Sequence, residues 1–248
     1  MRNASLYLFL FTLLFSFFDG ATAQTDPEGY TQKRLQMVAQ QIKARGISDS
    51  NVLAVMESVP RHAFVPKHIR SRAYIDRPLP IGAGQTISQP YIVALMSASL
   101  ALTGKETVLE IGTGSGYQAA VLSGLTARVI TMEIKPKLFE TASQRLKDLG
   151  FENVSCYLGD GYFGYPQKAP YDAIMITAAV DHIPPDLLKQ LKLGGRLILP
   201  LGNPFSYQHL VRVTKQAQRY SVQQITGVLF VPMTGRALQQ TGKRTTPD

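Results

Sequence analysis

The stretch VLEIGTGSGY, Val108–Tyr117, decides the fold. Its first half is apolar apart from Glu110, and its second half places Gly112, Gly114 and Gly116 at alternate positions. This pattern predicts a buried strand that ends in a tight turn and is followed by a helix. Such glycines let the backbone adopt positive φ and let a ligand lie against bare main chain, next to a helix N-terminus. We therefore expect a nucleotide-like ligand at this turn.

The spacing of the motif separates two kinds of nucleotide site. A dinucleotide fingerprint requires Gly-x-Gly-x-x-Gly, whereas here the third glycine comes one residue early and Glu110 lies two residues before the first. An acid at that position would repel a pyrophosphate but attract the positive sulfonium and amino groups of S-adenosylmethionine. Acid-x-Gly-x-Gly-x-Gly resembles the first motif of the Rossmann-like methyltransferases.

A second acid supports the same interpretation. The apolar run 128–132 ends in Glu133, about twenty residues after the first glycine, where a carboxylate at a strand end can accept both ribose hydroxyls. The alternative is a glycine turn and a solvated glutamate in an unrelated α/β protein.

Strand and helix patterns alternate along the chain and predict an α/β fold: a mostly parallel, doubly wound sheet of the Rossmann-like methyltransferase type. The last two strand-like runs have no helix between them, which predicts an antiparallel pair at the C-terminal edge of the sheet. The expected helices cover residues 30–45, 49–59, 92–102, 117–125, 136–149 and 185–191, and the expected strands cover 108–111, 128–133, 154–158, 171–179, 196–200, 210–214 and 222–232.

Composition narrows the class of protein. The 248 residues are 45% hydrophobic and carry a net charge of +9, with Lys and Arg scattered rather than clustered. This favours one domain with a mildly basic surface suited to anionic substrates, and not a nucleic-acid partner. Cys156 is the only cysteine and lies in a strand-like run, so we expect a core residue. The His and Asp residues show no ligand-like spacing, so no metal is expected.

The N-terminus has the pattern of an export signal. Arg2 precedes an apolar run, and Ala21-Thr22-Ala23 offers a small-x-small cleavage site. We expect a signal peptide at 1–23, a linker at 24–29, a methyltransferase domain at 30–240 and a disordered tail at 241–248. The exported protein would be periplasmic, with no stable membrane insertion after cleavage. The alternatives are an uncleaved anchor or a wrongly assigned start, and the latter makes the protein cytoplasmic.

The run PIGAGQTISQPY, residues 80–91, lies in a loop-rich segment that is too long to be a simple connection. It combines small residues with hydroxyls and carries no charge, which suits a wall that holds an oxyanion through backbone amides, Thr86 and Ser88. A helix is expected just after it. Ser88 is therefore either a functional group or only the N-cap of that helix.

Five runs together resemble the protein-L-isoaspartate O-methyltransferase family: VPRHAFVP, PLPIGAGQTISQPY, VLEIGTGSGYQAAVL, GDG and FVPMTG, which begin at residues 59, 78, 108, 159 and 230. The resemblance covers residues 30 to about 240. It implies that Ser88 is the active-site residue and that Ile81, Gly82 and Thr86 help form the pocket for the altered aspartyl residue. It further implies that Asp160 and Gly161 lie along the adenine and that Thr234 and Gln239 close over the donor.

The implied reaction is methyl transfer from S-adenosylmethionine to the free α-carboxylate of isoaspartyl residues in damaged proteins and peptides. A carboxylate with a pKa near 4 is already ionised at neutral pH, so no general base is required. The histidines are then more simply loop or packing residues, and the roles of His62, Asp181 and His182 stay open. We expect a monomer.

The export signal conflicts with a cytosolic methyl donor and leaves three hypotheses. An exported repair enzyme could meet donor that leaks or is imported. The domain could instead be a binding module for isoaspartyl or other anionic peptides. It could also methylate a different carboxylate or a small molecule.

Overall fold

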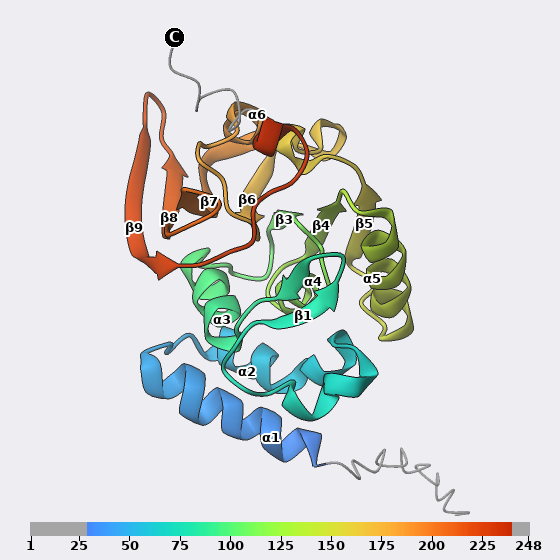
Figure 1. The fold of residues 1–248 in the computed structure, drawn as a ribbon. Helices are drawn as coiled ribbons and strands as arrows, with labels where there is room; N and C mark the ends of the chain where they lie inside the picture. Colours follow the sequence, from blue (N-terminus) through green and yellow to red (C-terminus); the bar gives the residue numbers. More distant parts are fainter. Residues whose placement is uncertain (1–28, 240–248) are drawn as a thin grey trace, which may run out of the picture.

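The computed structural model describes residues 29–239 (Figure 1). The expected signal peptide and tail lie outside the described residues, as does all of the expected linker except Gly29. Between residues 29 and 239, no helix is both long and apolar enough to cross a membrane.

A seven-stranded sheet with the order β5-β4-β3-β6-β7-β8-β9 forms the centre of the fold. Five strands are parallel, as predicted, and β7–β8–β9 are antiparallel pairs, which confirms the predicted edge. The strands are β3 (Thr107–Ile111), β4 (Arg128–Glu133), β5 (Val154–Leu158), β6 (Tyr171–Ile176), β7 (Leu191–Gly202), β8 (Gln208–Lys215) and β9 (Tyr220–Val228). The strand order reverses at β3, which is where open α/β sheets bind ligands.

Helices cover both faces of the sheet. One face carries α3 (Pro90–Ser99), α4 (Tyr117–Ser123) and α5 (Pro136–Asp148), and the other carries α6 (Pro185–Gln190). The two faces have separate apolar cores because successive strand residues alternate between them: Val108 belongs to the first core and Leu109 to the second.

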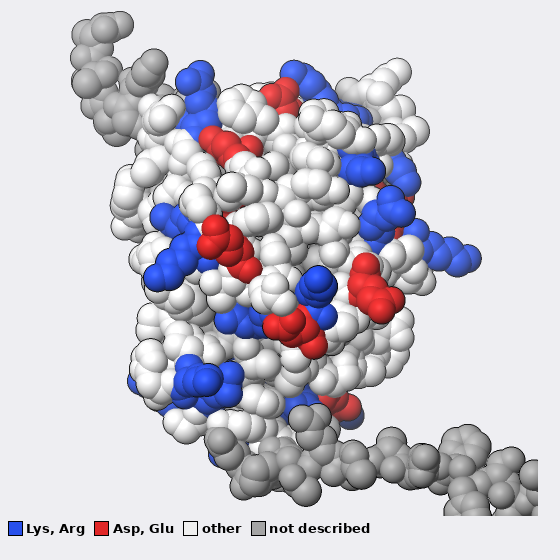
Figure 2. Space-filling view, turned by 90° about the vertical axis from the view of Figure 1, so that its right-hand side faces the viewer, with Lys and Arg blue, Asp and Glu red and all other residues white. Residues whose placement is uncertain are grey.

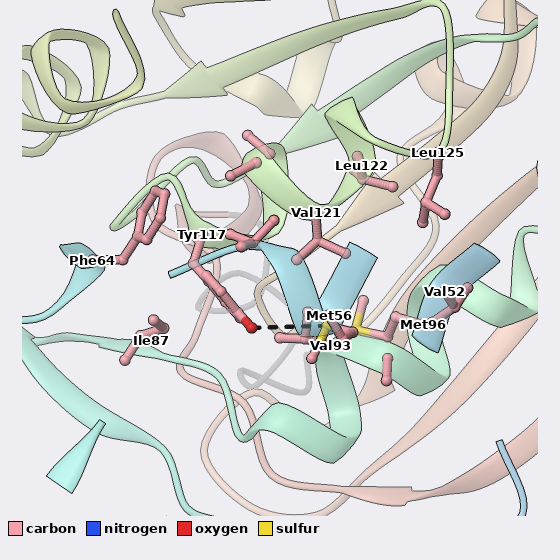
Figure 3. Close-up of a cluster of buried hydrophobic side chains, with 14 of the residues drawn as sticks. Val52, Met56, Phe64, Ile87, Val93, Met96, Tyr117, Val121, Leu122 and Leu125 are labelled. Carbon is pink, nitrogen blue, oxygen red and sulfur yellow. Dashed lines mark hydrogen bonds between the residues drawn. The ribbon is translucent and has the colours of Figure 1, made fainter. Parts of the chain in front are cut away.

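An N-terminal helical layer packs on the first face. The expected helix 30–45 is α-helical only over α1 (Tyr30–Met37) and continues as a π-helix to Ile42 and a 3-10 turn to Arg45, before the left-handed Gly46. Asp49 caps α2 (Ser50–Ser58) by accepting the amides of Asn51 and Val52. Figure 3 shows Met56 of α2 against Tyr117 and Val121 of α4 and against Val93 of α3, with the Tyr117 hydroxyl pointing at the Met56 sulfur.

The loop-rich segment 61–90 contains more regular structure than the sequence predicts. Two 3-10 helices, η3 (Arg61–Phe64) and η4 (Lys67–Arg72), precede a hairpin of β1 (Leu79–Gly82) and β2 (Gln85–Ile87). The hairpin turn uses three consecutive residues of positive φ, including Ala83, which sequence patterns do not predict.

Three element boundaries differ from the sequence expectation. The strand expected at 171–179 ends at Ile176, and β7 begins five residues before Arg196 because Leu191 pairs with Tyr171 before the register shifts. The run 222–232 leaves the sheet after Val228. The residues beyond it return to the middle of the sheet, where Pro232 bridges to Ala179 (Figure 1).

Candidate active site

A cavity of about 500 Å³ lies at the carboxyl ends of β3, β4 and β6, where the strand order reverses. Most of its lining comes from three groups of residues: the glycine turn with the ends of β4 and β5, the run before α3, and the segment around the end of β9. Thr177 after β6 and Tyr207 between β7 and β8 add to it. The lining residues include Thr86, Ser88, Gly112, Gly114, Gln118, Glu133, Lys135, Asp160, Gly161, Thr177, Tyr207, Leu229, Phe230 and Thr234.

The glycine turn exposes main chain to this cavity. Gly114 has φ 54°, a left-handed conformation that β-branched residues strongly disfavour. Its amide donates to Oε2 of Glu133 at 2.9 Å, and the amide of Gly112 donates to the carbonyl of Met132 at 2.8 Å. These hydrogen bonds attach the turn to the neighbouring strand, so this wall of the cavity is fixed.

Glu133 is the acid that reaches the cavity. Its side chain is buried, lines the cavity and accepts the amides of Gly114 through Oε2 and of Lys135 through Oε1, both at 2.9 Å. Each carboxylate oxygen has a second lone pair. The side chain is thus oriented and can still accept hydroxyl groups, as the sequence predicts for a ribose.

Glu110 is placed differently from the sequence expectation. It points to the opposite face of β3 from the cavity-lining Ile111, is fully buried, and accepts the Thr131 hydroxyl at 2.5 Å, with its other oxygen unpaired among the described residues. Burial raises the pKa of this carboxyl to about 8, with the Glu133 charge adding to the rise and the Thr131 hydrogen bond opposing it. Strand alternation thus points the Glu110 side chain behind the turn and away from the cavity, and its predicted contact with a cationic donor stays a prediction.

The residues expected along the adenine and over the donor divide into two groups. Asp160, Gly161 and Thr234 line the cavity, whereas Gln239 is exposed in the last described turn and does not. Asp160 accepts the amide of Tyr162 at 3.0 Å and that of Arg236 at 2.8 Å. Its carboxylate therefore attaches the C-terminal segment to the cavity wall.

The hydroxyl-bearing run before α3 forms the facing wall. Ser88 and Thr86 line the cavity, and neither side chain hydrogen-bonds to another residue within 29–239. The N-cap residue of α3 is Gln89, and its side chain does not cap the helix. Ser88 is thus not the helix cap, and its hydroxyl is available to a ligand.

Ile81 and Gly82 do not line the cavity. Ile81 packs behind the run, with its Cδ1 3.5 Å from the position that a Cβ on Gly114 would occupy, and Gly82 is exposed in the hairpin turn. The cavity therefore offers a substrate no contact with Ile81 or Gly82, and the predicted contact stays a prediction.

Asp76 holds the hydroxyl-bearing run in place. Its carboxylate accepts the side-chain amide of Gln89 at 2.6 Å and the backbone amide of Tyr91 at 3.3 Å, and pairs with Arg45 at 2.8 Å. The Arg45 guanidinium also lies over the Tyr91 ring at 3.4 Å. An ion pair from the N-terminal layer therefore positions the residues that precede α3.

Sequence reasoning missed several polar residues of the cavity, among them Thr177 and Gln118. Thr177 follows β6 directly and donates to the carbonyls of Ile111 and Gly112 at 3.0 and 2.7 Å. Gln118, in the first turn of α4, donates to Ser97 at 2.9 Å. Thr177 could have been found, because it is the first polar residue after a buried parallel strand and must lie at the ligand edge of the sheet.

Three residues to which the sequence assigns no role, His62, Asp181 and His182, do not line the cavity. His62 stacks on Tyr30 at 4.0 Å and bonds to Tyr74 within the N-terminal layer. His182 contacts Asp181 at 2.5 Å and Tyr162 at 2.9 Å, next to Gly161. Neither histidine lines the cavity.

The arrangement can hold two ligands of different charge. One wall offers main chain and the Glu133 carboxylate, and the other offers free hydroxyls with no carboxylate. In the described part of the chain no three His, Cys, Asp or Glu side chains gather in a way that could hold a metal ion. The Lys and Arg side chains on the face drawn in Figure 2 form separate groups with acids between them.

Comparisons with known proteins agree with this geometry. The family model of protein-L-isoaspartate(D-aspartate) O-methyltransferase matches residues 32–238. The chain is 59% identical over 240 residues to protein-L-isoaspartate O-methyltransferase 2 of Shewanella sediminis, covering 96% of this chain and 98% of that one. It is 50% identical over 205 residues to a Methanoculleus marisnigri protein-L-isoaspartate O-methyltransferase, covering 83% and 93%.

Two solved structures share the fold. A protein-L-isoaspartate O-methyltransferase superposes with a TM-score of 0.76 at 30% identity, covering 88% of this chain and 71% of that one. A Plasmodium falciparum structure described as a putative protein-L-isoaspartate O-methyltransferase in complex with S-adenosyl-L-homocysteine gives 0.71 at 24% identity, covering 81% and 98%.

Proposed function

Because this chain belongs to the protein-L-isoaspartate(D-aspartate) O-methyltransferase family, we propose that its cavity transfers a methyl group from S-adenosylmethionine to the α-carboxylate of L-isoaspartyl residues. One observation supports this most strongly: a single cavity joins the glycine turn and Glu133 to the free hydroxyls of Ser88 and Thr86. A cationic donor and an anionic acceptor can therefore meet there.

The glycine turn and the acids of the first wall fit the donor. Gly114 lines the cavity with bare main chain at φ 54°, which disfavours any side chain there, and Glu133 keeps acceptor capacity toward a pair of ribose hydroxyls. Asp160, Gly161 and Thr234 also line the cavity, and we assign the first two to the adenine and Thr234 to the cover over the donor. When bound, S-adenosylmethionine supplies a methyl group on a positively charged sulfur.

The second wall orients the acceptor. Ser88 donates a hydrogen bond to one oxygen of the α-carboxylate, which leaves the other oxygen to attack. The oxygen–methyl bond forms as the sulfur–methyl bond breaks, and the two opposite charges neutralise each other. Since the carboxylate is already ionised at neutral pH, the chain needs to align the reactants and exclude water, and it needs no general base.

A methyl-transfer assay tests this function. The full chain is incubated with labelled S-adenosylmethionine and either an isoaspartyl peptide or its normal aspartyl twin. Label should enter the first peptide and not the second. Equal labelling of both would redirect the activity to another carboxylate, and binding of the isoaspartyl peptide without labelling would identify a binding module.

We also propose that the protein is exported to the periplasm as a monomer. The basic start, the apolar run and the site after Ala23 support cleavage there. N-terminal sequencing of protein from a periplasmic fraction should begin at Gln24, and light scattering should give one chain per particle. Recovery of intact Met1 from the cytoplasm would contradict the export proposal.

A further inference from the structure

Three exposed apolar side chains lie on two segments that reach the cavity. The turn between β7 and β8 carries Phe205, 71% exposed, and Tyr207, 54% exposed, and the segment after β9 carries Leu229, 77% exposed. Tyr207 and Leu229 line the cavity. We call these three residues the apolar shelf.

The shelf is fixed, because one buried side chain joins its two parts. Gln208 is fully buried and donates through Nε2 to the carbonyls of Asn203 and Ser206, both at 2.7 Å. Its Oε1 accepts the amide of Phe230 at 2.8 Å. The β7–β8 turn and the segment after β9 therefore form one unit.

The packing of Tyr207 supports the same conclusion. Its phenol lies so close to Gly227 that any side chain at that position would collide with it. The exposed Tyr207 ring thus packs on the main chain of Gly227, where both residues line the cavity. Exposed apolar surface that is held in place beside a binding cavity is a common mark of an interaction site.

Charge identifies the kind of partner. The net charge of the chain is +9, yet residues 202–208 and 227–235 contain no Asp, Glu, Lys or Arg. Ionic recognition by the shelf is therefore excluded, and an uncharged, apolar group is the matching occupant. A polypeptide whose carboxylate enters the cavity brings its neighbouring residues close to these two segments.

We propose that the apolar shelf binds an apolar side chain next to the isoaspartyl residue and so selects among damaged sequences. This inference rests on the proposed function and adds the sequence preference of the acceptor. Phe205, Tyr207 and Leu229 are specificity residues, not catalytic ones. Burying one large apolar side chain there should favour such acceptors about 10-fold in kcat/KM, mainly through KM.

The test uses two isoaspartyl peptides that differ only in the adjacent residue, leucine in one and serine in the other. The full chain should prefer the leucine peptide about 10-fold in kcat/KM. Phe205→Ala should reduce that preference to about twofold or less, with S-adenosylmethionine affinity and turnover of the serine peptide nearly unchanged. Leu193→Ala is the matched control, since Leu193 is 69% exposed near the opposite end of β7 and does not line the cavity.

Two results would overturn the inference: equal kcat/KM for the two peptides with the unaltered chain, or an undiminished preference in Phe205→Ala. Failure of the proposed function looks different, because then neither isoaspartyl peptide accepts label from the unaltered chain. Donor affinity, measured for each variant, reports whether the variant is folded.

Discussion

The two walls of the cavity are built in different ways. The donor wall, residues 112–116 with Glu133, is attached to the end of β4 by main-chain hydrogen bonds to Met132 and by the Glu133 carboxylate. The acceptor wall comes from short segments outside the central sheet that single side chains hold, Asp76 under the run before α3 and Gln208 under the apolar shelf. The donor wall therefore depends on backbone geometry, whereas side chains on the acceptor wall can change without loss of the fold.

The largest expected effect tests the backbone dependence of the donor wall. Gly114→Val places a β-branched side chain at φ 54° in the turn that lines the cavity, where its Cβ would meet Ile81, and should weaken S-adenosylmethionine binding by more than about 100-fold in calorimetry. Gly150→Val is the control, because Gly150 has φ 77° but open space around it. Similar loss of binding in both variants would mean that backbone strain anywhere in the fold lowers donor affinity, and not the position of Gly114 in the cavity wall.

The second prediction concerns the acid of the donor wall. Glu133→Ala removes the acceptor of two backbone amides and of the proposed ribose contact, so donor affinity should fall about 100-fold. Glu133→Gln keeps one acceptor oxygen and should lie between the alanine variant and the original chain. Unchanged donor affinity in Glu133→Ala would show that the donor does not bind this carboxylate.

The third prediction addresses the acceptor wall. Ser88→Ala should lower kcat/KM on an isoaspartyl peptide about 10- to 100-fold, which corresponds to one hydrogen bond to a charged group, with donor affinity unchanged. Ser58→Ala, at an exposed residue of α2 away from the cavity, is the control and should leave both quantities unchanged. If Ser88→Ala instead weakens donor binding, the two walls are not separable.

The smallest effect on binding is expected at Glu110. Its raised pKa means that the folded state holds a proton that the unfolded chain loses above about pH 4.5, so the stability of the ligand-free protein should fall as pH rises from 5 to 8. Glu110→Gln should flatten this slope and stabilise the protein at pH 8 by roughly 2–4 kcal/mol, at about 1.4 kcal/mol per pKa unit. Denaturant titrations across this pH range measure the effect.

The same variant, Glu110→Gln, tests whether Glu110 contacts the methyl donor. Since the side chain lies behind the glycine turn, donor affinity should change less than about threefold. A large loss of donor affinity would restore Glu110 as a direct contact of the cationic donor.

The sequence predicts the donor wall better than the acceptor wall, for a physical reason. Strand period, glycine spacing and the acid that ends β4 are local patterns, and they predict the parallel sheet with its antiparallel edge and put the glycine turn and Glu133 at the cavity. Glu110 lies away from the cavity because a motif gives position along the chain, while strand alternation decides the face.

The acceptor wall depends on contacts between distant segments. Gln208 meets Phe230 across 22 residues, and Asp76 meets Arg45 across 31, and neither pair has a local signature. The hydroxyl-bearing run leaves Ser88 as either a functional group or a helix cap, and the resemblance favours the active-site role; the position of α3 shows that Ser88 is not the cap. The apolar shelf likewise becomes visible only when the β7–β8 turn and the end of β9 are seen together.

The most direct test of a cavity shared by donor and acceptor is a crystal structure of residues 24–248 grown with S-adenosylhomocysteine and an isoaspartyl peptide. We expect ribose hydroxyls on Glu133, main chain of the glycine turn against the ligand, and the peptide carboxylate at Ser88 in the same cavity. A ligand bound elsewhere, or a peptide carboxylate remote from Ser88, would show that the two walls do not form one active site.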